Sequence, residues 1–181
     1  MSLNYSYIKE GKNSIIQFNS EKKNNIKNIS LIKTLTEIFN QEIEYNEIKN
    51  LRPKKDLFYS EELKISSVEN YTSKIIKQLE IERSTLILSY ASIKKFLRKS
   101  KNYLSLNNFC KLFLISCFVN AKYNEDLTFC IKKYMKISQL KKKEIILLEK
   151  EFYRIIEYSL FVDEKIYNEY EKFFKEKEKE F

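Results

Sequence analysis

Lys122 and Glu149 are two charged residues that could share a chemical role. Lys122 follows an eight-residue apolar run, Leu112–Val119, and Glu149 stands in a later amphipathic segment. An ammonium and a carboxylate can pair with each other, or they can hold hydrogen-bonding groups of another protein. The end of the apolar run is therefore either the rim of the protein core or the start of a binding surface.

Enzymatic chemistry has few candidate residues in this sequence. There is no histidine, so general acid–base or triad chemistry would depend on carboxylates or lysines. The only glycine, Gly11, cannot form a glycine-rich phosphate loop. Cys110 and Cys117 share one face of the apolar segment, where cysteine acts as a small hydrophobe, and no histidine is present to complete a common zinc site. We expect no enzyme, cofactor, metal site or small-molecule substrate, although a pair of helix-borne carboxylates stays open as a catalytic alternative.

The cysteines and the net charge indicate the environment and the partners. An odd number of cysteines without a signal-peptide pattern predicts reduced thiols in a cytoplasmic and/or nuclear protein. The longest apolar run is well below the roughly 18 residues of a membrane span, so we expect a soluble protein without membrane contact. The formal charge is +9, but lysine dominates over arginine, the residue that nucleic-acid readers favour. Nucleic acid is therefore disfavoured as a partner.

The elements that position these residues are predicted to be helices. One glycine and one proline leave little turn chemistry, and 181 residues suffice for one domain with a proper core. Because the apolar run is hydrophobic on every side, it is predicted to be a helix surrounded by other helices. Apolar spacings of three and four, with capping residues, predict helices from Ser30 to about Ile48, Ser66 to Leu79, Glu82 to Lys99, Ser105 to Tyr123, Leu127 to Met135, Ser138 to about Glu157, and Asp163 onward.

Several stretches of the sequence resemble the P-type (U-type) cyclins, the single-box branch that includes phosphate-signalling cyclins. Their order and spacing carry the resemblance, and they are Ile65–Tyr71, Leu79–Leu88, Leu104–Asn107, Val119–Asp126 and Leu147–Phe152. The resemblance implies an all-α fold, namely a cyclin-box five-helix domain around a buried central helix with an extra N-terminal and C-terminal helix. The expected segments are a flexible lead-in (1–28), the N-terminal helix and connector (29–64), the cyclin box (65–160) and the C-terminal helix (161–181).

The resemblance also implies a function in kinase regulation, without catalysis by this chain. Cyclins bind and activate a cyclin-dependent protein kinase by holding its mobile helix in the active position. A lysine at the end of the third box helix and a glutamate in the fifth hold backbone groups beside that mobile helix, and these positions fall on Lys122 and Glu149. The flanking apolar contacts of the family fall on Val119, Tyr123, Tyr153, Tyr158 and Leu160.

The sequence also departs from the family pattern, and it leaves alternatives open. Lys94 occupies a position where many cyclins have an aspartate that pairs with an arginine of the first box helix, so we expect that ion pair to be absent. The substrate-docking patch of cell-cycle cyclins is not recognisable in Tyr71–Ile76. Lys122 could be a solvated helix end, and Lys141–Lys143 could be a phosphate-binding patch or a solvated helix face. The alternative function is a non-catalytic basic helical scaffold or a nucleic-acid-binding domain.

Overall fold

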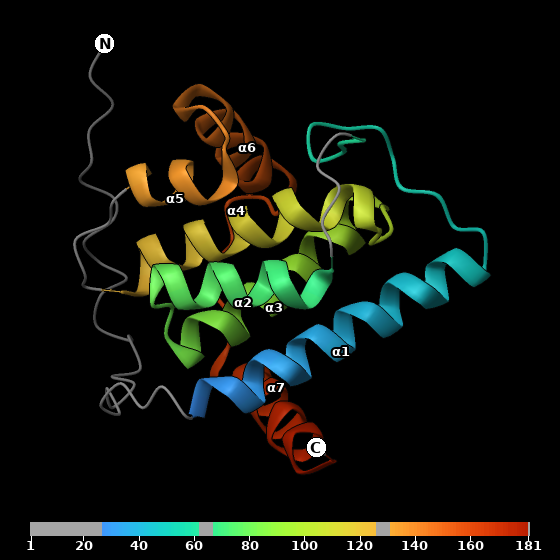
Figure 1. The fold of residues 1–181 in the computed structure, drawn as a ribbon, viewed down its shortest axis with the longest axis vertical. Helices are drawn as coiled ribbons and strands as arrows, with labels where there is room; N and C mark the ends of the chain where they lie inside the picture. Colours follow the sequence, from blue (N-terminus) through green and yellow to red (C-terminus); the bar gives the residue numbers. More distant parts are fainter. Residues whose placement is uncertain (1–26, 62–66, 126–130, 181) are drawn as a thin grey trace.

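The structure is a computed structural model that describes residues 27–61, 67–125 and 131–180, and these residues form helices joined by turns (Figure 1). No strand occurs in the described ranges, which confirms the all-α expectation. Most of the predicted lead-in, Cys130 and the predicted start of a helix at Leu127 lie outside these ranges. The helices are α1 (Lys27–Ile48), α2 (Val68–Leu79), α3 (Arg83–Ser100), α4 (Leu106–Asn124), α5 (Ile131–Ser138), α6 (Lys142–Ile155), α7 (Glu164–Lys177) and the 3-10 helix η3 (Glu178–Glu180).

Helix α4 is the centre of the molecule. Every residue from Leu112 to Ala121 is buried, because α4 packs against α2, α3, α5 and α6. A helix without a polar stripe is stable in water only when neighbouring helices cover all of its sides. The five helices α2 to α6 therefore form the predicted box around a buried central helix, with α1 and α7 packed against it from outside (Figure 1). This confirms the cyclin-box arrangement that the resemblance implied.

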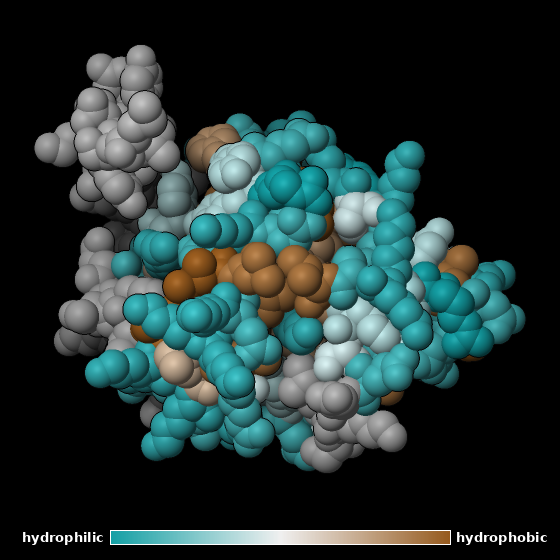
Figure 2. All heavy atoms as spheres, turned by 90° about the horizontal axis from the view of Figure 1, so that it is seen from above, coloured by the Kyte–Doolittle hydropathy of each residue, from teal (hydrophilic) through white to brown (hydrophobic). Residues whose placement is uncertain are grey.

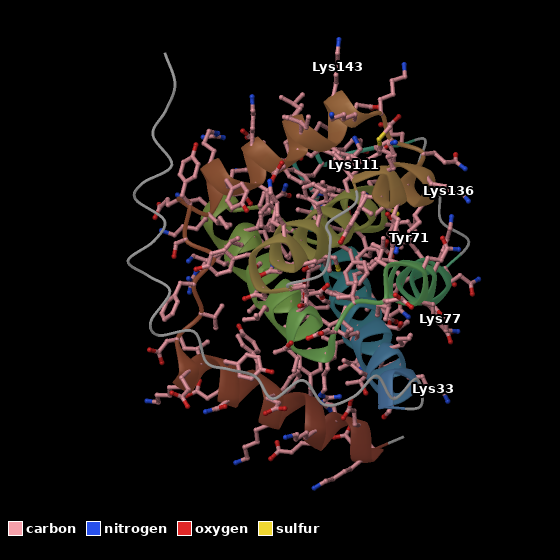
Figure 3. All side chains as sticks on the ribbon, turned by 90° about the vertical axis from the view of Figure 1, so that its left-hand side faces the viewer. Lys33, Tyr71, Lys77, Lys111, Lys136 and Lys143 are labelled. Carbon is pink, nitrogen blue, oxygen red and sulfur yellow. The ribbon has the colours of Figure 1, made fainter. Side chains whose placement is uncertain are left out.

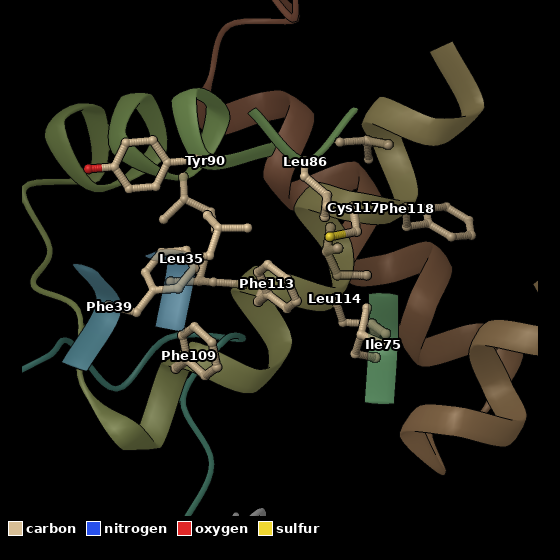
Figure 4. Packing of buried hydrophobic residues seen from close by; sticks show 14 of the residues in the cluster. Leu35, Phe39, Ile75, Leu86, Tyr90, Phe109, Phe113, Leu114, Cys117 and Phe118 are labelled. Carbon is tan, nitrogen blue, oxygen red and sulfur yellow. The ribbon is translucent and has the colours of Figure 1, made fainter. Parts of the chain in front are cut away.

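Aromatic rings of α1 pack against those of the central helix α4. The ring centroid of Phe39 in α1 lies 5.0 Å from that of Phe109 and 5.8 Å from that of Phe113, both in α4 (Figure 4). The interplanar angles are 62° and 74°, edge-on arrangements that aromatic pairs prefer. The first helix is therefore part of the hydrophobic core of the domain.

A second aromatic cluster holds the connector between α1 and α2. Phe58 is fully buried, and its ring centroid lies 4.7 Å from that of Phe96 in α3 and 6.3 Å from that of Phe152 in α6. The backbone N–H of Phe58 donates to the carboxylate of Asp56 at 2.9 Å, which stabilises a turn. The connector that the sequence analysis placed within residues 29–64 is therefore not extended at Phe58, because burial of this side chain bends the chain inward.

Two predicted helix starts differ from the structure. Ser30 lies inside α1, which already begins at Lys27, so it is not the cap. The cap of α2 is Ser67, whose hydroxyl accepts a hydrogen bond from the backbone N–H of Asn70 at 3.0 Å. The predicted cap, Ser66, lies outside the described residues. Adjacent serines can both satisfy the local pattern, and only the backbone conformation decides which one caps the helix.

Ser138 ends one helix instead of opening the next. It is the last residue of α5, and its hydroxyl donates to the carbonyl of Tyr134 at 2.7 Å. The predictions that α5 ends at Met135 and that Ser138 starts the following helix were therefore wrong, because α6 begins at Lys142. A serine hydroxyl can bond back to the carbonyl four residues earlier as readily as it can cap a helix.

The two described cysteines are buried in the core. Cys110 and Cys117 both lie on α4, and burial raises the pKa of each thiol to about 12. A thiol attacks disulfide reagents only as its thiolate. In a Cys130→Ser variant, we expect Ellman's reagent at pH 8 to react with neither thiol until the chain unfolds. The release of the coloured product during a urea titration measures this.

The matched control for the thiol experiment is the same variant in high urea, where both thiols must react. Burial raises the thiol pKa values in the folded chain, so the thiols of the unfolded chain lose their protons at lower pH. The contribution of the buried thiols to the free energy of unfolding is therefore fully present below about pH 8.5 and decreases as the pH rises toward 12. Rapid labelling of the folded chain at pH 8 would contradict the burial of these residues.

Candidate protein-binding site

Helices α4 and α6 bring Lys122 and Glu149 together. Lys122 lies in the last turn of α4 and Glu149 lies in α6, and the Nζ atom is 2.9 Å from Oε1. The neighbours Leu148 and Phe152 are buried in the core, which fixes the rotation of α6 and places Glu149 at the edge of the α4–α6 contact. The side chain of Glu149 is 13% exposed and that of Lys122 is 50% exposed. The pair is therefore partly shielded, with its lysine open to a partner.

A buried polar network fixes the end of α4. Asn120 is almost completely buried, and its side-chain amide donates to the hydroxyl of Ser92 in α3 at 3.0 Å and to the carbonyl of Ser116 at 2.8 Å. A buried amide without these partners would be costly, so the network favours one register between α3 and α4. Lys122, two residues after Asn120, is positioned by this network. The sequence signal was the single asparagine directly after the apolar run.

Tyrosine side chains lie next to the charged pair on the Glu149 side. The rings of Tyr153 and Tyr158 stack with an interplanar angle of 7° and a centroid distance of 6.2 Å. Burial, followed by the nearby Glu149 carboxylate and Tyr123, raises the pKa of Tyr153 to about 12, which reflects how close these groups lie. Tyr123 is 63% exposed and Tyr158 is 76% exposed. We use the name tyrosine shelf for the surface formed by these three tyrosines, Lys122 and Glu149.

The turn that presents Tyr158 has an unusual backbone. Glu157 and Tyr158 have φ values of 57° and 56°, the left-handed region, which costs roughly 1–2 kcal/mol for each residue with a side chain. Helix α3 stabilises this turn from the side: the ammonium of Lys99 pairs with the Glu157 carboxylate at 2.9 Å, and that of Lys95 donates to the Ser159 carbonyl at 2.8 Å. The orientation of Tyr158 therefore depends on contacts with α3.

Two of the residues predicted to contact a kinase are part of the core. Val119 has no exposed surface and Leu160 is 7% exposed. Val119 belongs to the buried part of α4, while Leu160 follows the turn after α6 and packs into the hydrophobic core. In this conformation both residues support the surface from inside. The charged pair and the three tyrosines, in contrast, reach the surface at least in part.

An apolar strip on α6 was not predicted as part of the site. Leu147 is an exposed leucine on α6, and Ile146 beside it is half-buried. Figure 2 shows apolar atoms gathered in a band on the face that α5 and α6 form, with hydrophilic side chains around it. Figure 3 shows Lys143 of α6 projecting outward at the top of the molecule, the face seen in Figure 2, and Lys136 of α5 projecting from its side. An exposed apolar strip with a charged rim is typical of protein interfaces.

The described residues offer little for other kinds of site. Among them, no group of three or more histidine, cysteine, aspartate or glutamate residues could hold a metal ion. None of the helices in those ranges is long and apolar enough to cross a bilayer. The site itself combines an ion pair, aromatic rings and an apolar strip.

Comparisons with known proteins point to one family. The family model described as Cyclin matches residues 7–160. Cyclin-U2-2 of Arabidopsis thaliana is 22% identical over 157 residues, which cover 82% of this chain and 68% of that protein. Cyclin-U4-2 of the same plant is 29% identical over 105 residues, or 58% of this chain, and Cyclin-U4-3 is 27% identical over 106 residues. The matches span about half of the length of these last two relatives, 49% and 48%.

Proposed function

This chain belongs to the cyclin family, with U-type cyclins among its relatives, and we propose that it binds and activates a cyclin-dependent protein kinase. Family membership supports a regulatory role over a catalytic one. The proposed partner is the catalytic subunit of the kinase, and the proposed location is the cytoplasm and/or the nucleus. The proposed mode of action is to hold the mobile helix of the kinase in its active position.

The observation that carries this proposal is the meeting of Lys122 and Glu149 at the end of the buried central helix. In the proposed complex, the ammonium donates to a backbone carbonyl of the kinase and the carboxylate accepts from a backbone N–H. Breaking the pair in the free chain costs little, because half-exposed ion pairs contribute about 0–1 kcal/mol. The two side chains can therefore exchange their mutual contact for contacts with a partner.

Activation in this proposal is a shift in population. A kinase aligns ATP only when the glutamate of its mobile helix pairs with the catalytic lysine. A partner that binds only the inward position of that helix must supply about 5.5 kcal/mol of differential binding to move the population from 1:99 to 99:1. Buried aromatic anchors contribute up to about 4 kcal/mol each at typical interfaces. Tyr123, Tyr153 and Tyr158 supply candidate anchors beside the charged pair.

The proposal predicts that the exposed Tyr158 is a binding residue. We expect the tagged chain to capture a protein kinase from its own cells, and we expect addition of the chain to raise the activity of that purified kinase. A Tyr158→Ser variant should bind the kinase at least about tenfold more weakly, a loss of about 1.4 kcal/mol, because it loses a large apolar contact. Titration of the purified kinase by surface plasmon resonance measures the change.

The matched control is Tyr45→Ser, since Tyr45 is 57% exposed near the C-terminal end of α1. It should bind like the wild type. Equal binding by all three chains would exclude the tyrosine shelf as the interface. If no kinase is captured and the chain instead binds nucleic acid with steep salt dependence, the alternative of a basic nucleic-acid-binding domain would replace the proposal.

A further inference from the structure

A groove of about 620 Å³ lies between the C-terminal half of α3 and the segment that leads into α7. Of the twelve residues that line it, four are lysine or arginine and none is acidic. The cationic residues come from α3 and from the residue that follows it. The opposite wall contains Phe161 and Ile166, residues that are 64% and 46% exposed. Of these lining residues, the kinase-binding proposal involves only Lys95, which supports the turn that presents Tyr158.

Most of the positive charge in the groove is not neutralised. Lys94 pairs with Glu42 of α1 at 2.8 Å, but among the described residues Arg98 and Lys101 take part in no ion pair. Lys95 donates to the carbonyl and the hydroxyl of Ser159, both uncharged acceptors. Burial, together with the charges of Lys99 and Arg98, lowers the pKa of Lys95. A negatively charged ligand would relieve this mutual repulsion.

The spacing of the cations favours an extended ligand over a single phosphate group. Lys95 and Arg98 are three residues apart on α3, roughly 4.5 Å along the helix axis, and Lys101 follows the helix in a left-handed backbone conformation with a φ of 50°. All three line the same groove. In an extended peptide, side chains on the same face recur about every 6.6–6.8 Å, so two acidic side chains of one peptide can contact different cations of the groove.

We propose that this groove binds an extended acidic peptide segment of another protein. Aspartate or glutamate side chains of the peptide face Lys95, Arg98 and Lys101, and an apolar side chain between them contacts Phe161 and Ile166. Charge complementarity selects the peptide, and the exposed aromatic wall supplies apolar contact area. The inference goes beyond kinase binding and does not depend on it. In a kinase complex, such a peptide would belong to a substrate or a regulator.

Fluorescence anisotropy with the full-length chain tests this proposal. The probe is a short fluorescein-labelled peptide in which glutamate alternates with leucine. The wild type should bind the peptide. The double charge reversal Arg98→Glu with Lys101→Glu should lower the binding constant at least about tenfold. The control is Lys132→Glu with Lys133→Glu on α5, which changes the net charge equally and should bind within about twofold of wild type.

A second pair of variants tests the apolar wall. Phe161→Ser should weaken peptide binding, whereas Ile48→Ser, which changes an exposed side chain at the end of α1, should not. Circular dichroism confirms that each variant is folded. Equal weakening by the two charge reversals would show general attraction between charges and overturn the proposal. Absence of binding at millimolar peptide, or tighter binding of a single-stranded oligonucleotide than of the peptide, would overturn it as well.

The same variants separate this inference from the kinase proposal. Arg98→Glu with Lys101→Glu should capture the kinase like the wild type, and Tyr158→Ser should bind the acidic peptide like the wild type. If Tyr158→Ser loses kinase binding but keeps peptide binding, the result supports the tyrosine shelf as the kinase interface, whatever the groove binds. Failure of one proposal therefore leaves a measurable result for the other.

Discussion

Alanine at Lys122 or at Glu149 is expected to weaken kinase binding by about 2–5 kcal/mol, or about 30- to 5,000-fold. The reason is that each substitution leaves a backbone group of the kinase buried at the interface without its hydrogen-bond partner. The free chain itself should lose little stability, because the ammonium–carboxylate contact of 2.9 Å is half open to water at Lys122. Calorimetric titration of the purified kinase measures the binding loss, and urea unfolding measures the stability.

The matched controls for these substitutions are Glu171→Ala and Lys175→Ala. These residues form an ion pair of 3.2 Å on α7, away from the tyrosine shelf. Both controls should bind the kinase like the wild type. If alanine at Lys122 and at Glu149 left the affinity within about twofold of wild type, the assigned interface would be wrong.

The second large effect concerns the core. Phe113→Ala should lower the free energy of unfolding by about 3–5 kcal/mol, since Phe113 is 1% exposed and α4 cannot collapse into the space that the ring leaves. Its ring lies 5.8 Å from Phe39 and 5.5 Å from Phe109, measured between centroids, so the substitution also loosens α1 (Figure 4). Equilibrium unfolding in urea, followed by circular dichroism, measures the change.

Tyr45→Ala is the control for the core substitution, because Tyr45 is 57% exposed on the same helix as Phe39. We expect it to change the free energy of unfolding by no more than about 0.5 kcal/mol. A loss of similar size in both variants, or a negligible loss in Phe113→Ala, would contradict the role of α4 as the packed centre of the domain.

The sequence predicted best those elements whose pattern allows one solution. An eight-residue apolar run can be stable in a helical protein only inside a bundle, and α4 ends within one residue of the predicted position at Tyr123. Asp163 was correctly predicted to cap the last helix, where its carboxylate accepts from the backbone N–H of Lys165 at 2.8 Å. Serines were less informative, since Ser30 and Ser138 can bond to several backbone groups.

Contacts between distant segments could not be predicted from local spacing. Lys94 does not belong to the expected ion pair of the family, but it pairs with Glu42 of α1 instead. Arg83 at the start of α3 binds Glu178 with two hydrogen bonds of 2.6 and 3.1 Å, so the 3-10 helix η3 near the end of the predicted C-terminal helix is docked on the domain. Such partners are set by how the helices pack, which a periodic pattern does not encode.

The candidate site was predicted in part for the same reason. The resemblance identified Lys122 and Glu149, which the structure places in contact, although no spacing rule links positions in two different helices. It could not reveal that Val119 and Leu160 face inward, because exposure depends on the neighbouring helices and on the turn after α6. The groove beside α3 was missed because its walls come from two separate segments.

A charge exchange tests the central claim most directly. In the variant Lys122→Glu with Glu149→Lys, the intramolecular ion pair can re-form, so the free energy of unfolding should stay within about 1 kcal/mol of wild type. The donor and the acceptor for the kinase are nevertheless exchanged, so we predict that calorimetry will find binding at least as weak as in the alanine variants of Lys122 and Glu149. Wild-type affinity in the exchanged variant would contradict the claim, because it would show that the pair acts only within the chain.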